Sequence, residues 1–235
     1  MLRDAALIAG KDLRTEWRSK VTLGQLAPFG LLVLILFAFG LDVDLRAGVL
    51  ALLAPGLLWI AVLFAAVLAV QRSFAVESAD AGMEGLRLSG IDPAGVFLGK
   101  AAAITAQLLV LEIVLGLGMA ALYGTRLGGP PLLITTCVLA TIGLAAVGTL
   151  FGALAATTRI RDTLVPVLFL PTVSPVLLAA TRASKAALGS DRVQGGVGLL
   201  ARVGDGWPWV RLLVVFTVVY TAVGIVAFGS LLEDG

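Results

Sequence analysis

The chain has 235 residues, of which 59% are hydrophobic and only 14% are charged. Soluble domains have about 45–50% apolar and about 25% charged residues, so this composition excludes an ordinary soluble domain. The formal net charge of +2 comes from bases spread along the chain, which excludes a basic patch for nucleic acid. Uncharged apolar runs of about 18 or more residues recur and predict transmembrane helices. We therefore expect an all-α, polytopic membrane protein with a single transmembrane domain over residues 1–235.

Residues 1–20 predict an amphipathic helix at the membrane interface. Its apolar residues recur in steps of three and four, so they share one face, and its five basic residues lie around the rest of the helix. These apolar residues are Leu2, Ala6, Ala9, Leu13 and Trp17. A basic amphipathic helix with a tryptophan on its apolar side tends to lie in the interface plane. The alternative is a solvated leader.

The remaining apolar segments predict about six membrane spans. They cover, approximately, residues 22–40, 48–70, 101–123, 131–157, 163–180 and 207–232. Pro55 lies in the second span, and Pro166, Pro171 and Pro175 lie in the fifth. Proline removes a backbone donor, so the fifth span is predicted to break or bend strongly. Broken spans often surround substrate pathways, and a purely structural kink is the alternative.

The distribution of lysine and arginine predicts the orientation. The leader carries five such residues, whereas the polar turn at 42–46, beyond the first span, carries one. Because cytoplasmic segments are enriched in these residues, both termini are predicted to lie inside, together with segments 71–100 and 159–162. The polar loop 181–206 is then outside, and its four bases weigh less because long loops contribute less to orientation.

The sequence contains no histidine and one cysteine, Cys137, within an apolar run. A lone cysteine allows no intrachain disulfide and is expected to be a small buried hydrophobe. Without histidine, the chain lacks the commonest metal ligand, the usual general base and the usual axial haem ligand. Gly99-Lys100 is followed by Ala101, so the phosphate loop of ATPases is also missing. We expect a non-catalytic chain that holds no metal or cofactor alone.

Glu112 lies near the middle of the third span. A charge there costs about 2.5–3.5 kcal/mol on insertion scales, so the side chain must meet a partner, a cavity or water, or carry a proton. Glu112 either lines a pathway or is a protonated carboxyl hydrogen-bonded near Gln107.

Small residues recur every four positions in the fourth span, at Gly148, Gly152 and Ala156. This spacing predicts a close-packed face, which we expect to be inside the bundle, with a subunit interface as the alternative.

Residues 71–100 form a charged segment between two apolar runs. Its four acids and three bases are Glu77, Asp80, Glu84, Asp92, Arg72, Arg87 and Lys100. Phe74, Met83 and Leu86 provide apolar contacts among them, so the segment predicts a short amphipathic helix that docks in a groove of a soluble partner. The alternative is a solvated loop helix that touches only lipid headgroups.

Three sequence blocks resemble a known family. Arg72-x-Phe74-x-x-Glu77 and Asp80-x-x-x-Glu84-x-Leu86, followed by Pro93 and Lys100, resemble the cytoplasmic loop of type-2 ABC permeases. The blocks Ala54-Pro55-Gly56-Leu57-Leu58-Trp59 and Leu170-Pro171-x-x-x-Pro175-x-Leu177-Leu178 resemble the CcmB (haem exporter protein B) family of cytochrome c maturation. Two positions depart from the pattern: Gln71 stands where an acid is expected, and Ala81 replaces a glycine, with Gly82-Met83 before Glu84.

The resemblance implies a multi-pass permease of the bacterial inner membrane, with the 181–206 loop in the periplasm. Its implied partners are a CcmA-like ATPase that binds ATP, CcmC- and CcmD-like membrane subunits, a CcmE-like haem chaperone and a second copy of the chain. The implied ATPase-coupling residues are Phe74, Glu77, Asp80, Met83, Glu84 and Leu86. The implied transmembrane motif residues are Pro55, Gly56, Trp59, Pro171 and Pro175.

The function implied is coupling of ATP hydrolysis by the partner to haem delivery or release at the periplasmic chaperone. Haem is a possible cargo of the complex, and the absence of histidine favours mechanical coupling over haem carriage by this chain. The competing interpretations are a type-2 export permease for a lipid, drug or polysaccharide, and a purely structural membrane scaffold.

Overall fold

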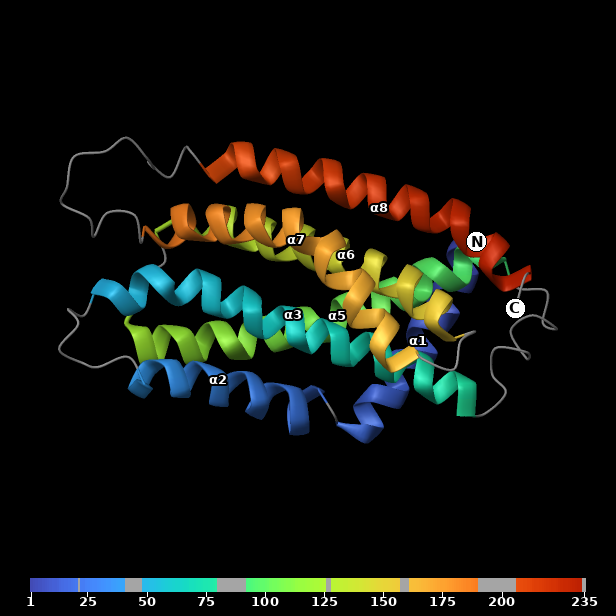
Figure 1. The fold of residues 1–235 in the computed structure, drawn as a ribbon, viewed down its shortest axis with the longest axis horizontal. Helices are drawn as coiled ribbons and strands as arrows, with labels where there is room; N and C mark the ends of the chain where they lie inside the picture. Colours follow the sequence, from blue (N-terminus) through green and yellow to red (C-terminus); the bar gives the residue numbers. More distant parts are fainter. Residues whose placement is uncertain are drawn as a thin grey trace.

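The computed structural model describes residues 1–20, 22–40, 48–79, 92–125, 128–156, 161–189 and 206–233. The regular structure in these ranges is entirely helical (Figure 1), which confirms the predicted all-α fold. The elements are α1 (Leu2–Ser19), the short π-helix η1 (Thr22–Leu26), α2 (Ala27–Gly40), α3 (Gly48–Ala79), α5 (Pro93–Tyr123), α6 (Pro130–Ala156), α7 (Arg161–Leu188) and α8 (Trp207–Glu233).

Five of these helices, α3, α5, α6, α7 and α8, are long and apolar enough to cross a membrane. Leu2–Ser19 and Gly24–Gly40 qualify as a sixth candidate only as a pair bent by 51°. The predicted first span corresponds to η1 and α2, and α2 alone has only 14 residues, fewer than the about 20 that a straight span needs. Five to six candidate spans confirm the predicted polytopic membrane protein.

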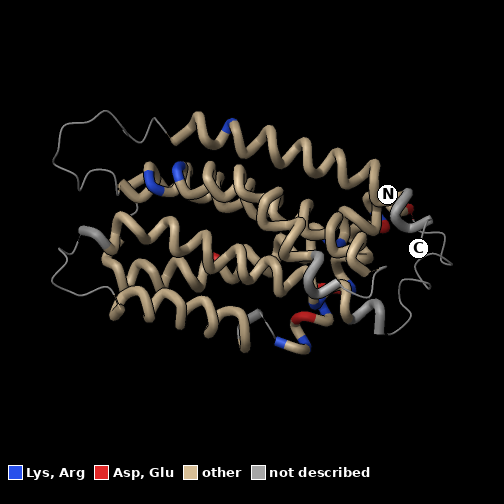
Figure 2. The backbone as a smooth tube through the Cα atoms, in the orientation of Figure 1, with Lys and Arg blue, Asp and Glu red and all other residues tan. Residues whose placement is uncertain are grey.

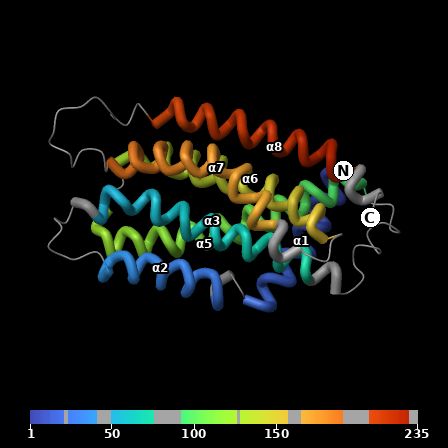
Figure 3. Tube along the Cα trace, in the orientation of Figure 1, coloured from blue at the N-terminus to red at the C-terminus, as the bar shows by residue number. Residues whose placement is uncertain are grey.

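The long helices lie side by side along the long axis of the molecule (Figure 3). α2 and α8 form opposite edges, with α3, α5, α6 and α7 between them (Figure 1). α1 lies at the end of the bundle that holds the N-terminus, and it packs chiefly against α5. The leader is therefore attached to a helix that is distant in sequence.

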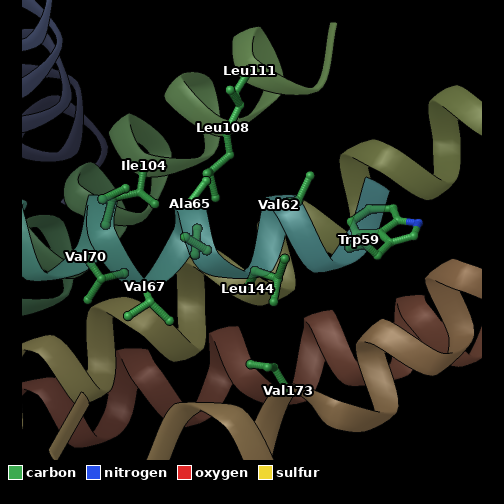
Figure 4. Close-up of a cluster of buried hydrophobic side chains, with 14 of the residues drawn as sticks. Trp59, Val62, Ala65, Val67, Val70, Ile104, Leu108, Leu111, Leu144 and Val173 are labelled. Atoms are coloured by element: carbon green, nitrogen blue, oxygen red, sulfur yellow. The ribbon is translucent and has the colours of Figure 1, made fainter. Parts of the chain in front are cut away.

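The core is centred on α3 (Figure 4). Its side chains, from Trp59 to Val70, lie between those of α5 and those of α6 and α7. Leu108 on α5, Leu144 on α6 and Val173 on α7 are completely buried around it. Lipid is as apolar as these side chains, so close packing and polar links, rather than exclusion from water, must hold such helices together.

The predicted close-packed face of α6 is confirmed as a contact within the bundle. A Cβ added at Gly148 would lie 2.4 Å from Val70 Cγ2, and one at Gly152 would lie 2.5 Å from the Phe74 ring. α3 therefore approaches α6 at a distance that only glycine allows at these two positions.

The helix ends differ from the predicted boundaries. α3 continues past the predicted end of its span at Val70 to Ala79, and α5 already begins at Pro93. The two ends of segment 71–100 therefore belong to α3 and α5, and the short amphipathic helix predicted between the spans falls partly on residues 80–91, which lie outside the described residues. Similarly, α7 runs to Leu188, so the first part of the predicted 181–206 loop is helical.

The prolines do not break the fifth span, because α7 is one helix that contains Pro166, Pro171 and Pro175; the alternative, a strong bend, stays a prediction. Pro175 has no N–H, which leaves the Pro171 carbonyl without its usual helical donor. The Ser174 hydroxyl donates to that carbonyl at 2.8 Å. A side-chain donor thus satisfies the freed backbone group, as such helices require in lipid.

We predict that Gly152→Val destabilises the protein, because the added side chain must displace Phe74 and Val70 at the contact between α3 and α6. Overpacking of this kind costs about 1–3 kcal/mol. Thermal unfolding in detergent measures the loss. The matched control is Gly116→Val, where a Cβ meets nothing within 4 Å; an equal loss in both variants would contradict the assignment.

Candidate functional site

Charged residues gather at the end of the bundle that holds the N-terminus (Figure 2). Three elements meet there: α1, the last part of α3 (residues 71–79) and the first part of α5 (residues 93–100). We call this region the charged end. It contains both helical ends that flank segment 80–91.

A buried lysine joins the three elements. Lys100 on α5 is fully buried, and its Nζ donates to Asp12 Oδ2 of α1 at 3.3 Å and to Ser73 Oγ of α3 at 3.2 Å. The centre of the Phe74 ring lies 4.8 Å from Nζ, in range of a cation–π contact. A buried ammonium group is tolerated only when it is paired and hydrogen-bonded. We call these four residues the Lys100 cluster.

A second ion pair supports the same junction. Arg72 Nε of α3 lies 3.9 Å from Glu16 Oε2 of α1. This pair is partly exposed, so it contributes little energy, about 0–1 kcal/mol. Its role is to fix the direction of α1 against α3.

The start of α5 is shaped for close contact with α1. Asp92 caps the helix by accepting from the Ala94 N–H at 3.0 Å, and Pro93 follows at the first helical position. A Cβ at Gly95 would lie 2.9 Å from Asp4 Cβ, and one at Gly99 would lie 2.7 Å from the Ala5 carbonyl oxygen. Sequence reasoning missed this site, although the four-residue spacing of the two glycines signals it.

Of the predicted ATPase-coupling residues, Phe74 requires a correction. Its side chain is 3% exposed and packs against Lys100 and the Gly152 backbone, so it is not an exposed docking contact of this chain. Glu77 belongs to α3, but the structure does not describe its side chain. The other predicted coupling residues, Asp80, Met83, Glu84 and Leu86, also lie outside them.

Glu112 makes a polar link between α5 and α6. It is 7% exposed, and its Oε1 accepts a hydrogen bond from the Thr141 hydroxyl. Its Oε2 has no hydrogen-bond partner in the part of the chain that the structure describes. The hydrogen bond expected near Gln107 is thus made by Thr141, whereas Gln107 lines a groove between α1 and α5.

The helical threonines use their hydroxyls in two ways. Several donate to the carbonyl four residues earlier in the same helix; these are Thr15, Thr105, Thr135, Thr136, Thr149 and Thr172. Thr141 and Thr217 instead donate to a different helix, Thr141 to Glu112 on α5 and Thr217 to the Leu139 carbonyl on α6. Within the described ranges, Glu112 belongs to no group of three acidic, cysteine or histidine residues that could hold a metal ion.

The predicted transmembrane motif connects α3 to α7. Trp59 is 1% exposed, and its indole Nε1 donates to the Ser184 hydroxyl of α7 at 3.0 Å. Pro55, one helical turn before Trp59, is also buried. On α7, Pro171 is exposed and Pro175 is half-buried. The link between the two motif helices thus passes through Ser184, a residue that the sequence did not single out.

Comparison with known proteins identifies the family of this chain. A family model described as CcmB protein matches residues 3–232. The chain belongs to the CcmB family. It is 30% identical over 196 residues to Heme exporter protein B of Paracoccus denitrificans (strain Pd 1222). The aligned region covers 81% of this chain and 87% of that relative. It is 30% identical over 187 residues to Heme exporter protein B of Pseudomonas aeruginosa (strain PAO1), which covers 78% of this chain and 81% of that relative.

We predict that Asp12→Ala strongly destabilises this CcmB-family protein, because it leaves Lys100 buried without its carboxylate. Breaking a buried pair costs about 3–5 kcal/mol, whereas replacing both partners by apolar groups is often neutral. The double variant Asp12→Ala/Lys100→Met should therefore recover most of the lost thermal stability. Asp4→Ala is the control, since Asp4 pairs with the exposed N-terminal amine. A double variant no more stable than Asp12→Ala would contradict the assignment.

Proposed function

We propose that this chain is the membrane permease subunit of an ABC complex of cytochrome c maturation. In this proposal it catalyses no reaction itself, and it couples ATP hydrolysis by a CcmA-like ATPase to haem delivery or release at a periplasmic, CcmE-like chaperone. The observation that carries the proposal is membership of the CcmB family over residues 3–232, with relatives named Heme exporter protein B. CcmC- and CcmD-like subunits and a second copy of this chain complete the proposed complex.

The charged end faces the cytoplasm in this proposal, with both chain termini inside the bacterial inner membrane. The described lysine and arginine side chains at this end are Arg3, Lys11, Arg14, Arg18, Lys20, Arg72 and Lys100. The described ones at the other end are Arg182, Lys185 and Arg211 (Figure 2). Enrichment of bases on the cytoplasmic side supports the assignment.

The Lys100 cluster supports a mechanical role for this end. Segment 80–91 is attached to α3 on one side and to α5 on the other, and Ser73 and Phe74 of α3 contact Lys100 of α5. A force that the ATPase applies to segment 80–91 therefore acts on α3, α5 and α1 together. From α3, the Trp59–Ser184 hydrogen bond carries a displacement to α7 and towards the opposite end of the bundle.

Haem is the proposed cargo of the complex, and the absence of histidine in this chain favours coupling over haem carriage. The competing function is an export permease for a lipid, drug or polysaccharide. Deletion of the chain distinguishes the two: loss of haem loading on the chaperone supports the first, and loss of substrate-stimulated efflux from vesicles supports the second.

We predict that Ser78→Cys, in a Cys137→Ala background, reacts with an impermeant thiol reagent only from the cytoplasmic side. Ser78 lies near the end of α3 at the charged end. Inverted vesicles and intact cells provide the two measurements. Labelling of intact cells from outside would overturn the orientation.

We predict that combined Glu77→Lys, Asp80→Lys and Glu84→Lys uncouples the ATPase. Opposite charges across an interface fix register and partner choice, so reversal replaces an attraction with a repulsion. Co-purification of the ATPase or cytochrome c maturation should fall while the permease still accumulates in the membrane. The single variant Glu84→Lys should be more harmful than Glu84→Ala. Normal assembly and maturation in the triple variant would remove the acidic segment from the mechanism.

A further inference from the structure

A groove of about 510 Å³ lies between the C-terminal part of α1 and the middle of α5. Its walls are mainly apolar, with Leu13 and Trp17 from α1 and Ala106 and Val110 from α5. Lys20, at the end of α1, forms part of its rim. Trp17 is 78% exposed and Val110 is 46% exposed, so the groove is open on the outer surface of the bundle.

The acids and bases of α1 differ in burial, although one acid, Glu16, lines the groove together with Lys20. Its three acids are half-buried and all face partners: Asp4 pairs with the N-terminal amine, Asp12 with Lys100, and Glu16 with Arg72. Its bases are all exposed. Arg14, Arg18 and Lys20 have no acidic partner among the described residues, and they lie on the same turns of α1 as Trp17. The outer side of α1 is therefore basic next to an apolar groove.

This combination fits a lipid better than a helix of another protein. A negatively charged headgroup satisfies clustered bases at a membrane surface, at about 1 kcal/mol per base. Tryptophan and lysine are the side chains that mark the boundary between headgroups and acyl chains. An apolar groove that begins at this boundary and continues along α5 can receive one acyl chain.

We infer that the groove between α1 and α5 is a binding site for an anionic phospholipid. An acyl chain lies between Trp17 and Val110, and the phosphate group of the lipid lies against Arg14, Arg18 and Lys20. The bound lipid would connect the basic side of α1 to α5 next to the Lys100 cluster. This inference does not depend on the cargo of the complex or on the ATPase.

The test uses the fluorescence of Trp17 in the full-length chain. Trp207→Phe and Trp209→Phe remove the tryptophans at the opposite end, and Trp59 stays as a buried reference at 1% exposure. The protein is placed in nanodiscs of unbrominated phosphatidylcholine that contain a small fraction of brominated-chain lipid. That lipid is either phosphatidylglycerol or phosphatidylcholine. We expect brominated phosphatidylglycerol to quench Trp17 to a given extent at a mole fraction on the order of tenfold lower than brominated phosphatidylcholine.

Two variants and a matched control decide the outcome. Arg14→Gln/Arg18→Gln/Lys20→Gln should abolish the preference, and Val110→Phe should reduce quenching by filling the groove. Arg3→Gln/Arg182→Gln/Arg211→Gln removes the same charge from exposed positions away from the groove and should keep the preference. Equal quenching by both lipids would overturn the inference. The inference would also be overturned if no brominated lipid quenched Trp17 in the assembled complex, since a protein partner would then occupy the groove.

Discussion

A buried ammonium group sets the arrangement of one end of this bundle. Lys100 has no access to solvent, so its charge must be met by the chain itself, and Asp12, Ser73 and Phe74 meet it from two other helices. Desolvation of an ion costs several kcal/mol, and only such a set of contacts offsets that cost. The position of α1 and the spacing of the two helix ends that flank segment 80–91 follow from this requirement.

Polar links between helices recur along the rest of the bundle. Two join side chains: Thr141 of α6 donates to Glu112 of α5, and Trp59 of α3 donates to Ser184 of α7. Two others run from a tyrosine hydroxyl to a backbone carbonyl: Tyr123 of α5 donates to Leu34 of α2, and Tyr220 of α8 donates to Thr172 of α7. Because apolar contacts with lipid and with protein are similar in energy, such bonds and the glycine contacts select one packing among many. In the proposed coupling, links of this kind would carry a displacement from the charged end to other helices.

Much of the fold was predictable from the sequence because hydropathy alone reveals helices that must span lipid. The glycines of α6 were predictable too, since their four-residue spacing places them on one face. The burial of Phe74 was not, because it depends on Lys100 and Gly152, which are distant in sequence. The same holds for Thr141 as the partner of Glu112. In α7, the Ser174 hydroxyl replaces the backbone donor that Pro175 lacks, in a way that a proline count does not reveal.

We propose that the Lys100 cluster makes α1 and α5 move as one body if an ATPase acts on segment 80–91. Distance measurements between spin labels at Leu7 on α1 and Ala102 on α5, in a Cys137→Ala background, test it directly in the assembled complex. Both positions are exposed. The account predicts the same distance distribution without nucleotide and with ATP, and a broader, nucleotide-dependent distribution when Asp12→Ala is added. A nucleotide-dependent change in the chain that retains Asp12 would contradict it.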